Sequence, residues 1–154
     1  TKFLHDGRFT RGLGKFTPVP HTPPAEVTDA EYPLILTTGR TLYHYNVATM
    51  TRLVAASARK SPDCFVEIHP ADLEKLGATD GQMLRISTRR GAIVARAIAT
   101  RKVRRGRIWM PFHFSEASAN VLTIDALDEI TKTPEYKVAA ARVEIAPEAC
   151  GCRR

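Results

Sequence analysis

The sequence predicts a mainly β fold with small helices, arranged as a β-rich barrel. Two observations lead to this prediction. Segments of about four to eight residues show either alternation of apolar and polar residues or a short apolar run, and turn-forming residues separate them. The chain has 154 residues, of which 44% are hydrophobic and 25% charged, as in one domain with its own core. No internal repeat appears, which favours a single barrel.

A polar, proline-rich segment precedes the expected barrel. Residues 1–31 are predicted to be a linker or extended arm, residues 32–147 the barrel, and residues 148–154 a tail. Because the chain begins at Thr1 instead of a Met, we expect it to be a piece of a longer protein. The prolines that restrict the arm and remove backbone donors are Pro18, Pro20, Pro23 and Pro24.

A strand followed by a helix is predicted where the barrel begins. The apolar run 33–38 ends at Gly39 and is typical of a buried strand. Residues 47–59 are expected to form a helix that stops before Pro62. The N-terminus of that helix would face the end of the strand and favour an anion there. The apolar residues at helical spacing are Met50, Leu53, Val54 and Ala58.

The rest of the barrel is expected to consist of short strands and one further small helix. Alternation with a period of two predicts strands, and a proline at a first helical position followed by a closing glycine predicts the helix. The predicted elements are a strand at 65–68, a helix from Pro70 to Leu76 closed by Gly77, a hairpin of 82–88 with 92–99 around Arg89-Arg90-Gly91, and strands at 108–110 and 142–145.

The chain is basic, with 23 Lys and Arg against 16 Asp and Glu and a net charge of +7. This charge suits a polyanionic partner such as a phosphorylated cofactor, a nucleic acid or an acidic protein, and charge alone does not choose among them. The basic residues gather in short clusters, which we interpret as solvated surface. These clusters are Arg89-Arg90, 101–107 and Arg153-Arg154.

The three cysteines are too few for a disulfide framework. Cys64 stands in an apolar strand and is expected to be a small buried thiol. Cys150 and Cys152 form a CxC pair without a second Cys or His group at metal-ligand spacing, so the sequence assigns them no role.

Three polar segments follow or join predicted strands, where binding sites are often built. In 37–46 the glycine permits close backbone approach and Arg40 offers a planar donor fork that suits a phosphate or a guanine edge. In 110–123 His113 lies between two aromatic residues, and in 134–137 a Tyr-Lys pair offers phosphate or base contacts. Each segment also has a structural explanation, as a turn or as a packed histidine.

The sequence contains no recognisable catalytic motif. It has no Walker loop, no HExxH, no GxSxG, and no GxGxxG after a strand. Polar side chains without a nucleophile or a metal cage are better suited to holding a ligand than to transforming one.

The ordered set of motifs resembles the C-terminal domain of formate dehydrogenase catalytic subunits, members of the molybdopterin oxidoreductase family. The resemblance extends over nearly the whole chain, to about Ile145, and the order of the motifs is more specific than any one of them. The segments that carry it are 7–9 and 23–26 in the arm, YPLILTTGR at 32–40, HYN at 44–46, TMT at 49–51, VEIHPAD at 66–72, FHF at 112–114, ANVLT at 119–123 and PEYK at 134–137.

The resemblance implies a double-psi β-barrel of the aspartate-decarboxylase-like kind that binds a molybdopterin guanine dinucleotide. In the complete subunit this would be one of two pterins that chelate molybdenum or tungsten. The residues that it implies as cofactor contacts are Thr38, Gly39, Arg40, His44, Asn46, Thr49, Met50, His113, Asn120, Tyr136 and Lys137.

The family's iron-sulfur cysteine motif and its Cys or selenocysteine metal ligand are absent from this sequence. We therefore expect the isolated chain neither to ligate the metal nor to oxidise formate. Its expected partners are the remaining domains of the catalytic subunit and electron-transfer subunits, with no nucleic acid and no membrane. A cytoplasmic location is expected, with a periplasmic one as the alternative. The competing hypothesis is a stand-alone basic barrel that binds nucleic acid or a protein.

Overall fold

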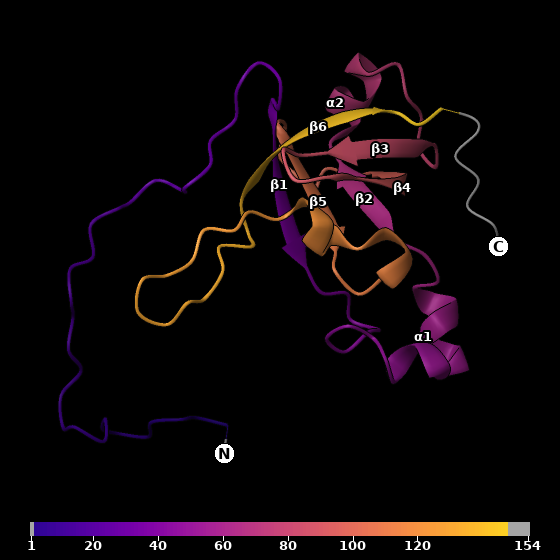
Figure 1. Cartoon of the computed structure of the whole chain (residues 1–154). Helices are drawn as coiled ribbons and strands as arrows, with labels where there is room; N and C mark the ends of the chain where they lie inside the picture. Colours follow the sequence, from indigo (N-terminus) through magenta and orange to yellow (C-terminus); the bar gives the residue numbers. More distant parts are fainter. Residues whose placement is uncertain (1, 148–154) are drawn as a thin grey trace.

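The structure is a computed structural model, and it describes residues 2–147. Six strands close into a barrel in the order β1-β5-β2-β4-β3-β6, with only short helices outside it (Figure 1). The predicted β-rich barrel with small helices is therefore confirmed. The strands are β1 (Leu34–Gly39), β2 (Phe65–Ile68), β3 (Met83–Ser87), β4 (Ala92–Ala99), β5 (Arg107–Pro111) and β6 (Ala139–Ile145); the helices are α1 (Ala55–Lys60) and α2 (Pro70–Lys75), with 3₁₀ turns η1 (Thr51–Leu53), η2 (Ser115–Ala117) and η3 (Ala119–Leu122).

Strand directions decide which loops meet. β1 pairs in parallel with β5, and β2 with β4, whereas every other neighbouring pair in the closed barrel is antiparallel. The register places Gly39 beside Pro111 and Leu36 beside Ala139. Consequently the last residues of β1, β3 and β5 and the first residues of β2, β4 and β6 lie together. We call this the Gly39 end of the barrel.

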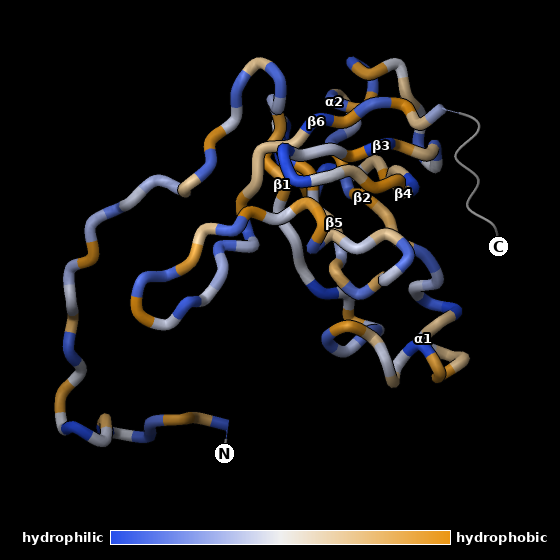
Figure 2. The backbone as a smooth tube through the Cα atoms, viewed as in Figure 1, coloured by the Kyte–Doolittle hydropathy of each residue, from blue (hydrophilic) through white to orange (hydrophobic). Residues whose placement is uncertain are grey.

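The barrel interior is filled by every second residue of the strands, as period-two alternation requires. Large aliphatic residues alternate there with alanines, which leave room for them in a narrow barrel. Figure 2 shows apolar residues recurring along the strands. Removing one such large side chain from water stabilises the fold by about 1.5–3 kcal/mol. The strand residues under 2% exposed include Leu36, Val66, Ile68, Leu84, Ile86, Ala95, Ala97, Ile108, Met110, Ala140 and Ala141.

The strand predictions agree closely with the structure, with one correction at β6. This strand begins at Ala139, not at residue 142 as predicted, because Ala139, Ala140 and Ala141 pair with β1. Alanine has a low strand propensity, but these residues lie in the barrel wall and are buried, so tertiary packing determines their conformation.

The predicted helix over 47–59 is wrong. The segment forms only η1 and α1, separated by Val54 in an extended conformation (φ −86°, ψ 108°). Ala48 is fully buried with φ 62°, a left-handed conformation that no α-helix accommodates. The expected apolar face is exposed, since Leu53 is 86% accessible. The helix N-terminus that was expected to favour an anion is therefore not present.

Helix α2 follows its prediction because its end signals are strong. Pro70 occupies the first turn, where a missing N–H costs nothing, and the His69 side chain accepts a hydrogen bond from the Ala71 amide at 3.1 Å. Gly77 closes the helix at φ 67°, in the left-handed region that glycine tolerates. Among the described residues, no helix is long and apolar enough to cross a bilayer.

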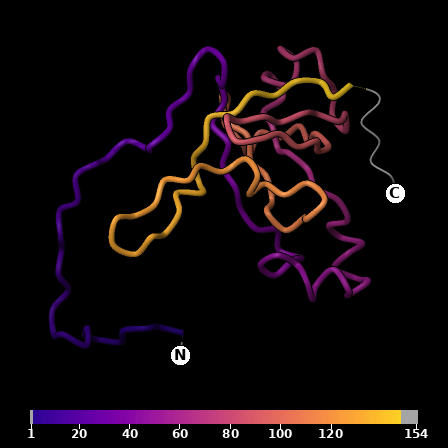
Figure 3. The backbone as a smooth tube through the Cα atoms, in the orientation of Figure 1, coloured from indigo at the N-terminus to yellow at the C-terminus, as the bar shows by residue number. Residues whose placement is uncertain are grey.

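The N-terminal arm begins away from the barrel and approaches it only near β1 (Figure 1). Residues 2–25 are exposed throughout, and the trace runs well away from the strands before it approaches β1 (Figures 1 and 3). Residues 26–32 contact the barrel through side chains described below. The tail with Cys150 and Cys152, and the Arg153-Arg154 cluster, lie outside the described residues.

Candidate functional site

The predicted site residues lie at the Gly39 end of the barrel, on three segments that the strand order brings together. The first segment is the end of β1 with the following loop 40–50. The second is loop 112–123 after β5, and the third is 134–138 before β6. Parallel pairing of β1 with β5 and antiparallel pairing of β1 with β6 makes these segments neighbours. Their proximity depends on tertiary structure, since about a hundred residues separate the first from the last.

Thr38 joins the first segment to the third. Its hydroxyl donates to the main-chain oxygen of Tyr136 at 2.9 Å, and Lys137 Nζ donates to the main-chain oxygen of Thr38 at 2.6 Å. The Lys137 ammonium also lies 4.9 Å from the centre of the Tyr136 ring, within cation–π range. Thr38 is 4% exposed, whereas Tyr136 and Lys137 are exposed. Thr38 therefore fixes the third segment against the end of β1.

His113 joins the first segment to the second, and it is 2% exposed. The Thr41 amide donates to Nε2 at 2.8 Å, so Nε2 carries no proton, and Nδ1–H donates to the main-chain oxygen of Asn46. Both ring nitrogens are thus used and the ring is neutral. Burial lowers the pKa of His113, and the neighbouring Arg40 guanidinium lowers it further, against the hydrogen bond to Asn46.

His44 is a second internally satisfied histidine, 3% exposed. Its Nε2 lies 2.7 Å from the Ser61 carbonyl, which only accepts, so Nε2 carries the proton. Its Nδ1 lies 3.1 Å from the Thr51 hydroxyl, which accepts from the Tyr45 amide at 3.2 Å and so donates its own proton to the ring. The centres of the two histidine rings lie 5.7 Å apart. Their hydrogen bonds fix the conformation of this loop, which stands where a helix was predicted.

Arg40 is the exposed cation of the first segment. Its Nη2 donates to the Asn46 side-chain oxygen at 2.9 Å, and its guanidinium lies 5.5 Å from the centre of the Phe112 ring. Asn46 adopts φ 47°, a left-handed conformation that asparagine tolerates better than most residues. One donor of the guanidinium is thus committed within the described chain, and the remaining donors face outward.

Gly39 allows the first segment to pass close to an aromatic side chain. A Cβ at this position would lie 2.5 Å from Trp109 Nε1 and 2.7 Å from Cζ2 of the same indole. Those distances are far below van der Waals contact, so any larger residue would displace the indole or the strand end.

Thr49, Met50 and Asn120 are exposed, and in the described residues their side chains make no hydrogen bond to the other predicted site residues. The main-chain oxygen of Asn120 accepts from the Thr123 hydroxyl at 3.0 Å, and the residue is exposed. The structure thus separates the predicted residues into two groups. Thr38, His44 and His113 are buried braces, whereas Arg40, Asn46, Thr49, Met50, Asn120, Tyr136 and Lys137 are exposed.

The exposed group forms a surface instead of lining one of the cavities that the described chain contains nearby. One cavity of about 660 Å³ is bordered by Arg52, Cys64 and Glu116 among others, and a second of about 380 Å³ by Thr41, Tyr43 and Phe65 among others; neither is bordered by a predicted site residue. The exposed group carries guanidinium, ammonium, amide and hydroxyl donors without a carboxylate, which suits the oxygens of a pyrophosphate and the edge of a base. The donor set therefore fits a nucleotide-type anion.

Sequence reasoning missed two ion-pair systems beside this surface. Arg52 donates two hydrogen bonds to the Glu116 carboxylate, of 2.8 and 2.9 Å, and this ion pair joins η1 to η2. Glu26 of the arm pairs with both Arg89 and Arg90, so these arginines are not the solvated cluster that was predicted. Glu26 is one of four acidic residues in the arm, and nothing in its local sequence distinguishes it from the others. The available sequence signal for an ion pair was Arg89-Arg90 before the hairpin glycine Gly91, together with an acidic residue in the arm.

Three further observations bear on the chemistry available. Cys64 is a buried core thiol, as expected. The hydroxyls of Thr41 and Ser61 are buried without a hydrogen-bond partner within the described chain. Among residues 2–147, no group of three His, Cys, Asp or Glu side chains is placed to hold a metal ion.

Comparison with known proteins places these features in context. A family model described as Molydopterin dinucleotide binding domain matches residues 34–140. An F420-dependent formate dehydrogenase 1 subunit alpha from Methanococcus maripaludis is 47% identical over 133 residues, which are 86% of this chain and 20% of that protein. A nitrate reductase from Symbiobacterium thermophilum is 44% identical over 129 residues, which are 81% of this chain and 17% of that protein.

The fold agrees with a solved structure. Acetylene hydratase from Pelobacter acetylenicus superposes with a TM-score of 0.67 at 20% identity, covering 75% of this chain and 19% of that chain. At this identity the likeness establishes the fold alone. The chain spans about a fifth of the length of the curated relatives it matches.

Proposed function

This chain belongs to the Molydopterin dinucleotide binding domain family, and we propose that it binds the guanine dinucleotide form of the pterin cofactor through the exposed donors at the Gly39 end of the barrel. Family membership itself supports a molybdopterin-type cofactor. The observation that carries the finer proposal is the convergence of Arg40, Asn120 and Lys137 on one barrel end, on loops that buried side chains hold in place.

The buried residues act as braces in this proposal. His113 bonds the Thr41 amide and the Asn46 carbonyl, and so determines the path of the loop that presents Arg40. Because His113 is neutral, it adds no charge to the surface. Thr38 and Lys137 hold the third segment against β1, and the two ammonium protons left on Lys137 are available to an anion.

The exposed residues provide binding and orientation. The guanidinium of Arg40 and the ammonium of Lys137 neutralise a pyrophosphate, and the amide of Asn120 offers one donor and one acceptor to a base edge. When bound, the cofactor with its molybdenum or tungsten ion supplies the two-electron redox chemistry, which the described side chains do not contain.

We propose further that the chain is the C-terminal domain of an oxidoreductase of the formate dehydrogenase kind, which converts formate to carbon dioxide. The identity of 47% to a formate dehydrogenase alpha subunit supports this parentage. The 44% match to a protein named nitrate reductase supports the further proposal that other parts of the subunit select the substrate. The remaining domains, and electron-transfer subunits, are then its partners in the cytoplasm.

The test of the binding proposal uses the full chain and guanosine diphosphate as probe. Titration followed by NMR is expected to shift amide resonances in 38–46, 119–123 and 134–138, and Arg40→Ala with Asn120→Ala to abolish the shifts. Arg101→Ala, a matched change of an exposed arginine in the β4–β5 turn, should leave them unchanged. Equal, salt-sensitive binding of an arbitrary DNA duplex would favour the nucleic-acid hypothesis instead.

A further inference from the structure

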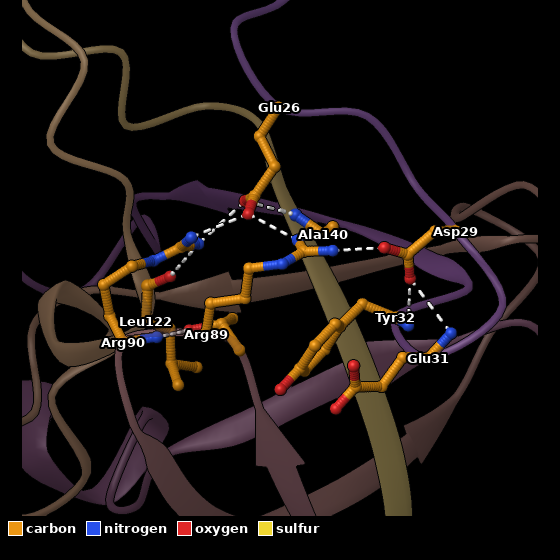
Figure 4. A network of polar contacts seen from close by, with 9 residues as sticks. Glu26, Asp29, Glu31, Tyr32, Arg89, Arg90, Leu122 and Ala140 are labelled. Atoms are coloured by element: carbon orange, nitrogen blue, oxygen red, sulfur yellow. Dashed lines mark hydrogen bonds and ion pairs between the residues drawn. The ribbon is translucent and has the colours of Figure 1, made fainter.

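The arm residue Glu26 stands at the centre of a polar network on the barrel (Figure 4). Its carboxylate accepts two bonds from Arg90, at 2.7 and 2.8 Å, one from Arg89 at 2.7 Å, and one from the Ala140 amide of β6 at 2.9 Å. Arg89 also pairs with Asp29 and lies 4.7 Å from the centre of the Tyr32 ring. Thus one carboxylate joins the arm to the β3–β4 hairpin and to β6.

Arg90 extends this network to the loop that carries Asn120. Its Nη2 donates to the main-chain oxygen of Leu122 at 3.2 Å. The next residue, Gly91, lies so close to this loop that a Cβ would be 2.6 Å from Val121 Cγ1 and 3.3 Å from the Val121 oxygen. The hairpin tip is therefore packed against η3. The Arg90 guanidinium, which Glu26 binds, links the two through its hydrogen bond to Leu122.

The arm also contacts the third segment of the site. The Ala25 amide donates to Glu135 Oε2 at 3.2 Å, next to Tyr136. Ala140, whose amide donates a hydrogen bond to Glu26, lies three residues after Lys137. Residues 25 and 26 thus touch the neighbourhoods of two of the three site segments, although neither residue belongs to the exposed donor surface.

From these contacts we propose that Glu26 is a positioning residue of the cofactor site: it holds Arg90 against Leu122, and so places the loop that presents Asn120. This inference rests on the proposed function for the meaning of Asn120, but the placement of the loop is a separate, measurable claim. Docking of the arm is then coupled to assembly of the site through the Glu26 carboxylate.

The geometry distinguishes this contact from an ordinary surface ion pair. The Glu26 side chain is 13% exposed and the Arg90 side chain 26%, so solvent screens the pair less than it does exposed charges. Bidentate Arg–carboxylate pairing restricts both side chains in orientation as well as distance. The hydrogen bonds from Arg90, and with them those from Ala140 and Arg89, lower the pKa of Glu26 to about 2 against its burial, so the carboxylate is charged under ordinary conditions.

The experiment replaces Glu26 without changing its shape. In Glu26→Gln, we expect the amide resonances of 119–123 in the full chain to shift and their ¹⁵N relaxation to report greater mobility. Arg90→Lys keeps the charge but loses the planar fork, and is expected to produce the same change. The matched control is Glu31→Gln, because Glu31 is exposed on the same arm segment and its side chain makes no ion pair in the described residues. Fluorescence of Trp109 verifies that each variant is folded.

Binding of guanosine diphosphate supplies the second readout. Glu26→Gln should weaken affinity about tenfold, and Glu26→Gln with Asn120→Ala should bind no more weakly than Asn120→Ala alone, because both changes act through one loop. Unchanged resonances of 119–123 in both Glu26→Gln and Arg90→Lys would overturn the inference, and so would additive losses in the double variant. If the loop moves but the wild-type chain binds no nucleotide, the proposed function fails while the placement of the loop by Glu26 stands.

Discussion

Lys137 donates a hydrogen bond of 2.6 Å to the main-chain oxygen of Thr38, a residue 99 positions earlier in the chain. With the reciprocal bond from the Thr38 hydroxyl to the Tyr136 oxygen, it fastens the segment before β6 to the end of β1. The same barrel end carries Arg40 immediately after Gly39. A cationic surface is thereby assembled from parts of the sequence that have no local reason to be together.

The Thr38 hydroxyl is expected to stabilise the fold measurably. Thr38→Val keeps the shape of the buried side chain but removes the donor to the partly buried Tyr136 carbonyl, so the free energy of unfolding should fall by about 1 kcal/mol. Urea denaturation measures this change. The neighbouring Thr37→Val is the control, because Thr37 is in the same strand and makes no side-chain hydrogen bond in the described residues; an equal loss there would remove the role assigned to Thr38.

His113 should make stability depend on pH in the mildly acidic range. Burial is the main cause that lowers the pKa of His113 in the folded chain, and the Arg40 guanidinium adds to it. The unfolded chain therefore binds a proton more readily at this residue. The contribution of neutral His113 is therefore fully present above its ordinary pKa of 6.5 and is lost as pH falls from there toward the lowered folded value. Protonation would also displace the Thr41 amide from Nε2.

The measurement is urea unfolding of the wild type and of His113→Gln at pH 7.5, 6.5 and 5.5. Glutamine can donate and accept hydrogen bonds but does not titrate in this range. The stability advantage of the wild type should shrink as the pH falls. A constant difference between the two proteins over this range would contradict the lowered pKa.

Gly39 is expected to tolerate no side chain. Gly39→Ala places a Cβ within 2.5 Å of Trp109 Nε1, and displacing a packed indole costs on the order of 1–3 kcal/mol. Trp109 is the single tryptophan of the chain, so its emission spectrum reports the displacement directly. The control is Gly77→Ala, where a Cβ would meet no atom within 4 Å and only the backbone conformation is strained; the Trp109 emission of that variant should match the wild type.

Cys64 should be chemically inert in the folded chain. Burial, with the charge of Glu116, raises the pKa of its thiol to about 12, and the thiol donates weakly to the Ala117 oxygen at 3.5 Å. Because only the thiolate is nucleophilic, iodoacetamide at pH 8 should leave Cys64 unmodified until urea unfolds the protein. Mass spectrometry of the peptide containing Cys64 decides the question, and rapid alkylation of the native chain would show that the residue is accessible.

The sequence predicted those features that depend on local chemistry. Alternation or a short apolar run located each barrel strand except the first three residues of β6, and Pro70 with Gly77 located α2, because each signal acts within a few residues of its effect. The helix over 47–59 failed because buried Ala48 and the bonds of His44 are determined by distant packing. Glu26 escaped notice for the same reason, since its partners are more than sixty residues away.

The site prediction divides in the same way. Residue types identified the donors, such as Arg40 and Asn120, because a guanidinium or an amide has the same chemistry in any fold. They did not reveal that Thr38 and His44 make their hydrogen bonds inside the protein, since burial follows from the closed barrel; for His113 a packed histidine was one of the two interpretations. The cofactor contact of each predicted residue remains a prediction that mutation tests.

The central claim is that the exposed donors at the Gly39 end hold the pterin dinucleotide. Its most direct test is the pterin content of the complete catalytic subunit carrying Arg40→Ala and Asn120→Ala, measured by fluorescence of the oxidised pterin after purification. We expect a large loss of bound pterin in the double variant while the circular dichroism of the subunit is unchanged, and no loss for Arg101→Ala. Full pterin content in the double variant would contradict it.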